Sequence, residues 1–381
     1  MSLAALSLLV LAAWIALAAT RLPILTPPPR LRQPAPQRAS PSVAAVIPAR
    51  NEEETIGAVI RAHFASDYPG ALAVVIVDDH STDETAARVI AASGGKMSLI
   101  EAPPLPAGWT GKLWAVNAGL AHVSEIAPNA RYVLLADADI VFAPDTLRKL
   151  VAQAEETGAA LTSLMARLDA RGFWGGLLIP AFVYFFQKLY PFHDANDPGK
   201  PLAAAAGGCM LLRRDALDAI GGVEAIRGRL IDDCALAAAV KKSGRPVWIG
   251  LAKDEAISLR DNRSLASIWS MVARSAFAQL GHSWLLLIGT VACMIILYPA
   301  PTVIALAYPL HGDEIAAVIA AAAWTLMALT YLPTARVYDQ APWKAFFLPV
   351  AALLYTMMTI ASAINHARGM GGQWKGRTYP A

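Results

Sequence analysis

Four long apolar segments, at the two ends of the chain, constrain its fold most strongly. They cover residues 2–20, 284–310, 315–333 and 345–364. A segment inside a bilayer must pair all of its backbone N–H and C=O groups, so segments of this length would cross a membrane as helices. Of the 381 residues, 56% are hydrophobic and only 16% are charged, which is too apolar for an ordinary soluble protein. We therefore expect a membrane-attached protein.

The charges next to the first apolar segment favour a retained anchor. A cleaved signal peptide is the alternative, but it needs a cationic start, and residues 2–20 carry no charge. Four arginines follow the segment: Arg21, Arg30, Arg32 and Arg38. Because positive residues tend to stay on the cytoplasmic side, we expect the chain after the anchor to lie in the cytoplasm.

The apolar pattern predicts five regions. They are an N-terminal transmembrane anchor at 1–21, a proline-rich linker at 22–42, a folded domain at 43–282, a transmembrane region at 283–365 and a basic tail at 366–381. The number of spans stays open. Three spans after a cytoplasmic domain would put the basic tail outside, against the positive-inside rule. A break at Pro299 and Pro301 would make the first of them a re-entrant pair and restore an even count.

Charge and cysteine content argue against several kinds of partner and site. The net charge of +3 is too small to argue for nucleic acid, and no basic–aromatic patch is visible. Cys209, Cys234 and Cys293 show no disulfide framework, and no cysteine–histidine cluster has zinc-site spacing. Neither a P-loop nor a dinucleotide-binding glycine motif occurs.

Short apolar runs alternate with helical patterns in the middle of the chain. The runs typical of strands are 43–48, 73–77, 98–100, 132–136 and 246–249. Alternation of strand and helix at this spacing predicts an α/β fold with a parallel sheet. In open sheets of this kind, ligands bind beyond the C-terminal ends of the strands. Four aspartates lie at such ends: Asp78, Asp79, Asp137 and Asp139.

The pair Asp137 and Asp139 has two interpretations. If the strand continues, residues i and i+2 point to the same face and the two carboxylates converge on one point. Two carboxylates at such a short distance raise each other's pKa unless a cation neutralises their charges. Mg2+ or Mn2+ suits one or two carboxylates together with the phosphates of a substrate. Alternatively, Asp139 or Asp145 caps the helix that Pro144 starts.

Three further polar sites also have two interpretations each. Glu52 precedes a helical pattern, and acidic residues stabilise the first turn of a helix. Glu52 therefore has either this capping role or a functional one. Asp232 and Asp233 open a helical stretch that runs to residue 242, as caps or as a second functional carboxylate pair. Lys112 follows a glycine-punctuated loop at a helix start, where it holds a phosphate or lies in solvent.

Residues 172–192 are rich in Phe, Trp and Tyr, and Lys188 is their only charged residue. Aromatic residues favour the lipid interface, so this stretch is expected to form a helix at the membrane surface or facing an acceptor. A buried core helix is the alternative.

Four motifs, in this order, resemble those of the family 2 glycosyltransferases, which have the GT-A fold. Residues 46–53 resemble the opening strand–turn motif, 76–83 the nucleotide-base loop, 137–139 the metal motif and 232–233 the catalytic-base motif. The loop at 108–112, the C-terminal apolar segments and residues 373–379 resemble, more narrowly, the bacterial hopene-associated membrane glycosyltransferases. The resemblance implies a Rossmann-like, mostly parallel sheet with flanking helices, plus transmembrane helices at both ends.

The resemblance also implies an activity. A sugar would pass from a nucleotide-sugar, in the first place a UDP-sugar, to a lipid acceptor such as a hopanoid, with inversion at the anomeric carbon. The protein would be a multi-pass protein of the bacterial inner membrane, with its catalytic domain in the cytoplasm.

Roles for individual residues follow from the same resemblance. Asp137 and Asp139 would hold Mg2+ or Mn2+, and Asp233 would be the general base beside Asp232, with these last two roles interchangeable. Contacts to the donor would come from Pro48, Arg50, Glu52, Asp79, Lys112 and Arg274. The first four would contact the nucleoside or shape its loop, and the last two would bind the diphosphate.

One motif departs from the wider family. Its membrane members often carry Gln-x-x-Arg-Trp after the catalytic base, whereas residues 271–275 keep only the arginine, Arg274. The contacts assigned to the missing Gln and Trp therefore do not carry over, and a processive polysaccharide synthase is disfavoured.

Two other functions stay open. A haloacid-dehalogenase-like phosphatase also has an apolar strand ending in Asp-x-Asp, followed by a later acidic pair. Here Val141 stands where that motif has Thr, and two strand–helix units precede it. A non-catalytic membrane scaffold is the third possibility.

Overall fold

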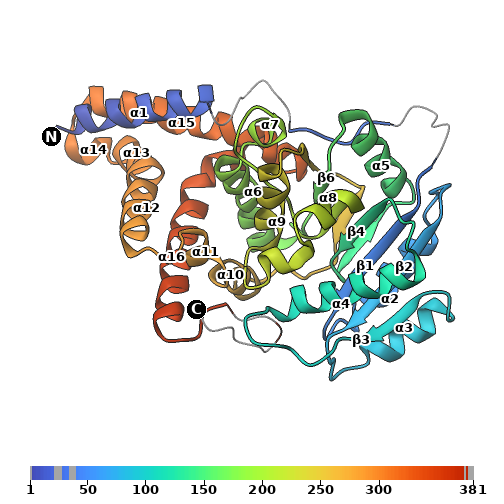
Figure 1. The fold of residues 1–381 in the computed structure, drawn as a ribbon. Helices are drawn as coiled ribbons and strands as arrows, with labels where there is room; N and C mark the ends of the chain where they lie inside the picture. Colours follow the sequence, from blue (N-terminus) through green and yellow to red (C-terminus); the bar gives the residue numbers. More distant parts are fainter. Residues whose placement is uncertain (1, 21–27, 34–39, 373–374, 376–381) are drawn as a thin grey trace. The chain divides into compact units, whose positions relative to one another are not determined.

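The computed structural model describes residues 2–20, 28–33, 40–372 and 375, which belong to two compact units. The sheet unit comprises Pro28–Leu168 and Phe192–Arg260. The helical unit comprises Met1–Pro27, Asp169–Pro191 and Asp261–Ala381. Each unit thus combines segments that are far apart in the sequence, as the colours of Figure 1 show.

A seven-stranded sheet, in the order β3-β2-β1-β4-β7-β6-β8, forms the centre of the sheet unit (Figure 1). Its strands are β1 (Val43–Ala49), β2 (Leu72–Asp78), β3 (Ser98–Glu101), β4 (Tyr132–Ala136), β6 (Leu161–Met165), β7 (Cys209–Arg213) and β8 (Val247–Leu251). Within the described part of this sheet, β7 alone runs antiparallel to its neighbours, β4 and β6. A second, two-stranded sheet pairs β5 (Ile140–Phe142) with β9 (Ala256–Ser258). The predicted mostly parallel α/β sheet is confirmed.

Helices cover both faces of the sheet. They are α2 (Ile56–Phe64), α3 (Thr85–Ser93), α4 (Gly111–Ile126), α5 (Thr146–Thr157), α7 (Phe192–Asn196), α8 (Arg214–Ala219), the 3-10 helix η1 (Gly222–Ile226) and α9 (Asp232–Lys242). In β1, Val43 and Ile47 belong to one core with α2, α3 and α5, whereas Val46 belongs to a second core with α4 and α9. A strand covered on both faces needs a continuous apolar run. Polar side chains can therefore gather only beyond the strand ends.

Part of the expected linker covers an edge of the sheet. Residues 28–33 lie against β8, where the Leu251 N–H donates to the Pro29 carbonyl at 2.8 Å and Leu31 is buried. Such cover removes part of an exposed strand edge. The rest of the linker around Arg21 and Arg38, and the tail from residue 376 onward, lie outside the described residues.

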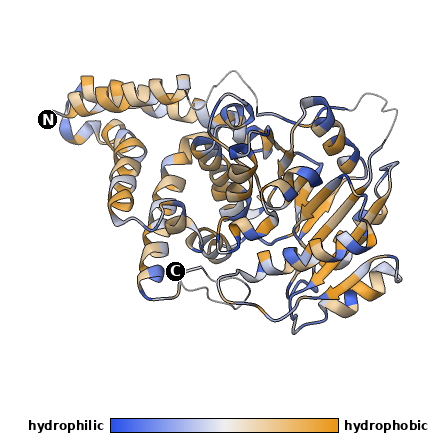
Figure 2. Cartoon of the chain, viewed as in Figure 1, coloured by the Kyte–Doolittle hydropathy of each residue, from blue (hydrophilic) through white to orange (hydrophobic). Residues whose placement is uncertain are grey.

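The helical unit contains the apolar segments. Its helices are α1 (Leu3–Thr20), α6 (Gly172–Leu189), α10 (Leu265–Ala273), α11 (Ala276–Gln279), α12 (Trp284–Leu297), α13 (Pro299–Leu306), α14 (Tyr308–His311), α15 (Glu314–Val337), η2 (Pro342–Phe347) and α16 (Leu348–Ala367). Four helical segments in the described chain are long and apolar enough to cross a membrane: Leu3–Thr20, Trp284–Leu306, Glu314–Val337 and Pro342–Ala367. Orange, the colour of hydrophobic residues, dominates α1 and α15 in Figure 2.

The break expected at Pro299 is present. Proline has no backbone N–H, so α12 ends at Leu297 and α13 begins at Pro299. Pro301 cannot donate to the carbonyl of Leu297, four residues before it. The indole N–H of Trp14, in α1, donates to that carbonyl at 2.9 Å. The anchor helix thus satisfies a backbone group that the break would leave without a donor.

The aromatic stretch is helical, and one of its faces is buried. Leu178, Ile179 and Tyr184 in α6 are inaccessible to solvent, whereas Phe173, near the start of the helix, is exposed. The hydroxyl of Tyr184 lies 3.0 Å from that of Thr330, in α15. The middle of α6, between residues 175 and 184, therefore belongs to the core of the helical unit, which agrees with the buried-helix interpretation for that part.

Candidate functional site

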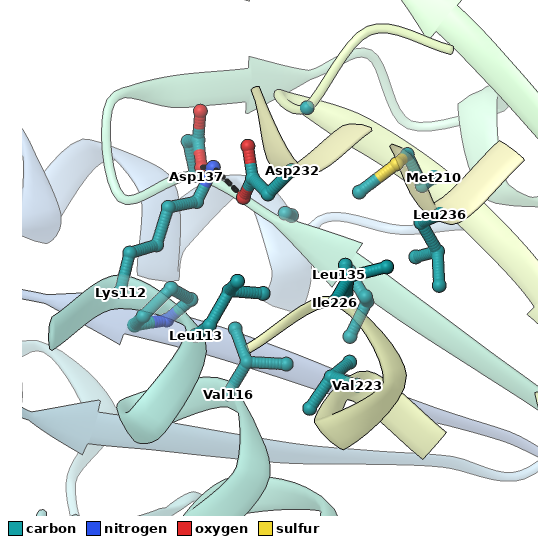
Figure 3. A pocket seen from close by; sticks show the side chains of 13 residues that line it. Lys112, Leu113, Val116, Leu135, Asp137, Met210, Val223, Ile226, Asp232 and Leu236 are labelled. Atoms are coloured by element: carbon teal, nitrogen blue, oxygen red, sulfur yellow. Dashed lines mark ion pairs between the residues drawn. The ribbon is translucent and has the colours of Figure 1, made fainter. Parts of the chain in front are cut away.

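Four charged side chains gather beyond the C-terminal end of β4: Lys112, Asp137, Asp232 and Asp233. They come from the start of α4, from the turn after β4 and from the first turn of α9. Lys112, Asp137 and Asp232 line one pocket together with apolar side chains such as Leu135 and Val223 (Figure 3). The position agrees with the expectation that a ligand site lies beyond the strand ends.

Lys112 lies at the centre of this cluster. Thr110 caps α4 by accepting a hydrogen bond from the Leu113 N–H, which fixes the turn that carries the lysine. The ammonium lies 2.9 Å from Oδ1 of Asp137 and 3.1 Å from Oδ2 of Asp232. Burial alone would lower the pKa of Lys112, but the charges of Asp137 and Asp232 outweigh it and keep the pKa above its usual value. The interpretation of Lys112 as a solvated loop lysine is therefore wrong.

Asp137 and Asp139 differ from the expected strand pair. β4 ends at Ala136, and the Ile140 N–H donates to the Asp137 carbonyl at 3.1 Å, so the two aspartates lie in a turn. Asp137 pairs with Lys112, whereas Asp139 is only 8% exposed and accepts a hydrogen bond from the Ser258 hydroxyl at 2.7 Å. The convergence argument from strand alternation was therefore wrong, because the turn interrupts the alternation.

The two carboxylates nevertheless interact. Burial raises the pKa of Asp137, Lys112 lowers it and the charge of Asp139 raises it, so that the pKa lies above its usual value. The capping alternative does not hold for Asp139, because its described partner is Ser258. Asp145 does occupy the N-cap of α5, but its carboxylate pairs with Lys149 at 2.9 Å and makes no capping hydrogen bond.

Asp232 and Asp233 occupy the first turn of α9, whose N-cap is Ile231. Asp232 faces Lys112. The carboxylate of Asp233 accepts hydrogen bonds from the backbone N–H groups of Cys234 at 2.7 Å and Gly207 at 2.9 Å. Burial and the neighbouring charge of Asp232 nevertheless raise the pKa of Asp233 to about 6. Asp233 is thus a fixed carboxylate that is mostly ionised at neutral pH but able to take a proton.

The expected nucleoside-binding residues lie around the ends of β1 and β2. Asp79 is 1% exposed, and the Arg50 guanidinium donates to the carbonyls of Asp79 and His80. Glu52 accepts a hydrogen bond from the Thr55 hydroxyl at 3.1 Å. These contacts join the two loops after β1 and β2 into one structure. Helix α2 begins at Ile56, so Glu52 precedes its first turn, and the Glu52 carbonyl accepts a hydrogen bond from the Ile56 N–H at 2.9 Å.

Two further residues expected to contact the donor, Pro48 and Arg274, belong to different units. Pro48, in β1, lines the same pocket as Lys112. Arg274 follows α10 and belongs to the helical unit, so the cluster described here is formed without it. The helical pattern at 264–279 is interrupted at this arginine, between α10 and α11.

Sequence reasoning missed two residues that shape the site. Gly207 donates to Asp233, and a Cβ built on it would lie 3.2 Å from the Lys112 ammonium. Ser258, in the small second sheet, fixes Asp139. The two neighbouring glycines at 207 and 208 were a signal of close backbone approach, whereas nothing in the sequence around Ser258 indicated its role.

The donor set suits a hard divalent cation that also binds a substrate. In the part of the chain that the structure describes, no group of three or more His, Cys, Asp or Glu is placed to hold a metal ion. Asp137 and Asp139 offer only carboxylate oxygens, and their charges repel each other. Mg2+ or Mn2+ commonly takes one or two carboxylates and completes its shell with phosphate oxygens and water. The residues present fit that arrangement.

Known proteins resemble this chain in sequence and in fold. The model of glycosyl transferase family 21 matches residues 3–380. Two curated 4,4'-diaponeurosporenoate glycosyltransferases of Staphylococcus aureus are each 26% identical to this chain. The match to the protein of strain bovine RF122 / ET3-1 covers 210 residues, which are 55% of this chain and 53% of the relative. The match to the protein of strain MRSA252 covers 206 residues, which are 54% of this chain and 52% of the relative. The chain thus spans about half the length of the curated relatives it matches. A mannosyltransferase from Pyrobaculum calidifontis, solved in complex with GDP-Man and Mn2+, has a similar fold, with a TM-score of 0.54 and 21% identity over 96% of this chain and 98% of that one.

Proposed function

Because the chain belongs to glycosyl transferase family 21, we propose that it transfers a sugar from a nucleotide-sugar to a lipid acceptor, with inversion at the anomeric carbon. The observation that carries this proposal is the cluster of Lys112, Asp137, Asp232 and Asp233 at one pocket beyond β4. The cluster combines the Lys112 ammonium, which can bind phosphates, with the Asp233 carboxylate, whose pKa of about 6 suits proton transfer.

Asp233 is the general base in this proposal. The acceptor hydroxyl oxygen forms a bond to the anomeric carbon, the bond from that carbon to the diphosphate oxygen breaks, and the hydroxyl proton passes to Asp233. A base works best when its pKa lies near the working pH. The two backbone N–H groups that hold the Asp233 carboxylate keep it oriented, and Asp232 holds the Lys112 ammonium.

The other proposed residues bind the donor. Asp137 and Asp139 would hold Mg2+ or Mn2+, which supplies positive charge that offsets the charge developing on the leaving diphosphate. Lys112 would bind diphosphate oxygens, because an ammonium forms charge-assisted hydrogen bonds with phosphate. Asp79 and Glu52 would contact the nucleoside, of a UDP-sugar in the first place, in a loop shaped by Pro48 and Arg50.

A lipid acceptor at a bacterial inner membrane completes the proposal. Four helical segments are apolar enough to cross a membrane, and the curated relatives are named for a carotenoid acid, 4,4'-diaponeurosporenoate. A polyisoprenoid-type lipid, hopanoids included, is therefore the acceptor class to test. We place the sheet unit in the cytoplasm, because Arg30 and Arg32 follow the anchor helix.

A donor screen tests the proposal. The full chain, in nanodiscs made with bacterial lipid extract, is given UDP- and GDP-sugars with Mg2+ or Mn2+, and both nucleoside diphosphate and labelled lipid are measured. We expect the two products to appear in equal amounts. Release of inorganic phosphate without sugar transfer would favour a phosphatase, efficient transfer to water-soluble acceptors would overturn the lipid acceptor, and no transfer with any donor would favour a scaffold.

A further inference from the structure

At the proposed site, the Lys112 ammonium interacts with several carboxylates. Lys112 pairs with Asp137 at 2.9 Å and Asp232 at 3.1 Å, and the charge of Asp233 also acts on it. Asp137 in turn feels the charges of Asp139 and Asp232. The four acidic side chains carry more negative charge than one lysine can neutralise, so the cluster attracts a further cation.

The lysine is held firmly where it contacts Asp137. Its side chain is 22% exposed, and its ammonium lies next to the backbone of Gly207, where a Cβ would approach it to 3.2 Å. Figure 3 shows the Lys112 side chain extending toward Asp137 and Asp232. The ammonium therefore contacts Oδ1 of Asp137, a carboxylate that would also hold the proposed metal.

We propose that Lys112 is an internal counter-ion that competes with the divalent cation for Asp137. The inference rests on the proposed function and concerns the order in which that site is filled. A divalent cation alone must displace the lysine from Asp137, which leaves the ammonium without a second partner. A nucleoside diphosphate offers Lys112 new oxygen partners and offers the cation phosphate ligands, so the two bind better together than singly.

This competition makes metal and nucleotide binding cooperative. If the nucleotide raises the affinity for the cation by some factor, the cation must raise the affinity for the nucleotide by the same factor. Lys112 is a positioning residue in this scheme. Its effect on the metal is exerted through Asp137 and needs no turnover to be observed.

Mn2+ binding to the full chain in nanodiscs, followed by electron paramagnetic resonance, tests the inference without a sugar-transfer assay. Wild type, Lys112→Met, Lys112→Arg and Lys96→Met are compared with and without UDP, and then GDP. Lys96 is an exposed lysine between α3 and β3, with no ion pair in the described structure, so it controls for the loss of one positive charge. Thermal unfolding confirms that each variant is folded.

We expect Lys112→Met to bind Mn2+ at least about tenfold more tightly than wild type without nucleotide, because a competing charge next to the carboxylate is gone. Lys112→Arg and Lys96→Met should stay within about threefold of wild type. The nucleotide should strengthen Mn2+ binding to wild type clearly more than to Lys112→Met. Equal or weaker Mn2+ binding by folded Lys112→Met, or no Mn2+ binding by any variant, would overturn the inference.

The inference and the proposed function can fail separately. Tighter Mn2+ binding by Lys112→Met, in a protein that transfers no sugar, would support the counter-ion role of Lys112 and contradict the proposed activity. Sugar transfer by wild type, together with unchanged Mn2+ affinity in Lys112→Met, would support the proposed activity and contradict the counter-ion role of Lys112.

Discussion

Lys112 and Lys188 are partly buried cations that the two units accommodate in opposite ways. In the sheet unit, Lys112 forms ion pairs with Asp137 and Asp232. In the helical unit, Lys188 donates a hydrogen bond to the Tyr298 hydroxyl at 2.8 Å, and its ammonium lies 5.4 Å from the ring centre of Trp14. No ion pair of Lys188 with an Asp or Glu is found among the described residues.

Under the proposed function, Lys112 carries a charge that binds substrate, whereas Lys188 carries one that contributes to packing. An ammonium held by carboxylates can exchange them for phosphates, because both are oxygen anions. An ammonium held by a hydroxyl and by aromatic faces suits apolar surroundings, where a carboxylate partner would add a second desolvation cost. We therefore expect substitutions around Lys112 to change catalysis, and substitutions around Lys188 and Trp14 to change mainly stability.

The largest effect is expected from Asp233→Asn, which removes the proposed base. General-base catalysis contributes about a hundredfold to ten-thousandfold, so kcat should fall on the order of a thousandfold. Asp215→Asn is the matched control, because Asp215 is an aspartate in the first turn of α8 that pairs with Arg213. Steady-state transfer with both variants in nanodiscs checks this. An Asp233→Asn variant with at least a tenth of wild-type kcat would remove Asp233 from the mechanism.

The comparison itself is tested by replacing each lysine with methionine. Loss of a charge-assisted hydrogen bond to the diphosphate costs about 1.5–3 kcal/mol, so Lys112→Met should lower kcat/KM for the donor about 10- to 150-fold. Lys188→Met should keep kcat/KM within about threefold of wild type, because its contacts are with aromatic side chains. Donor titrations measure both. Equal losses in the two variants would contradict the division of roles.

Trp14→Phe tests the packing role of the helical unit. The change removes the indole N–H that serves the Leu297 carbonyl, which Pro301 leaves without a donor. An unsatisfied buried carbonyl costs about 1–3 kcal/mol, so the unfolding temperature should fall by a few degrees while kcat stays unchanged. Thermal unfolding in detergent measures this, with Trp343→Phe, at an exposed tryptophan, as the control. An unchanged unfolding temperature would show that the hydrogen bond is dispensable.

The smallest effect is expected from Gly207→Ala. Its Cβ would lie 3.2 Å from the Lys112 ammonium and 3.6 Å from the Asp233 carboxylate, so the lysine side chain must shift by a few tenths of an ångström. A misplacement of about 1 Å can cost a hundredfold, and we expect this smaller shift to lower kcat/KM only about two- to fivefold. Transfer kinetics at saturating acceptor measure it. No change, with the fold intact, would mean that Lys112 is less tightly placed than the distances indicate.

The fold and the region of the site could be predicted from local sequence patterns. Buried parallel strands such as β1 need continuous apolar runs, which are visible in the sequence. Asp79 and Asp137 directly follow β2 and β4, so acidic residues after apolar runs indicated the edge of the sheet where the candidate site lies. In contrast, β7 could not be predicted, because its position between β4 and β6 depends on pairing with strands distant in sequence.

The geometry of the site was only partly predictable. The acidic pairs could be noticed in the sequence, but the partners of Lys112 lie in a different loop and a different helix, and only the folded chain brings them together. The expected convergence of Asp137 and Asp139 failed because β4 stops one residue before Asp137. Spacing alone cannot show where a strand gives way to a turn.

The pH dependence of kcat/KM tests most directly the central claim, that Asp233 takes the proton of the acceptor. Burial and the charge of Asp232 raise the pKa of Asp233 to about 6. Protonation removes the base, so kcat/KM should be level above about pH 7 and fall tenfold per pH unit below about pH 6. In Asp232→Asn, the pKa of Asp233 loses one raising influence, so the bend should move to lower pH. A profile without a bend between pH 5 and 7, or a bend that does not move in Asp232→Asn, would contradict the assignment.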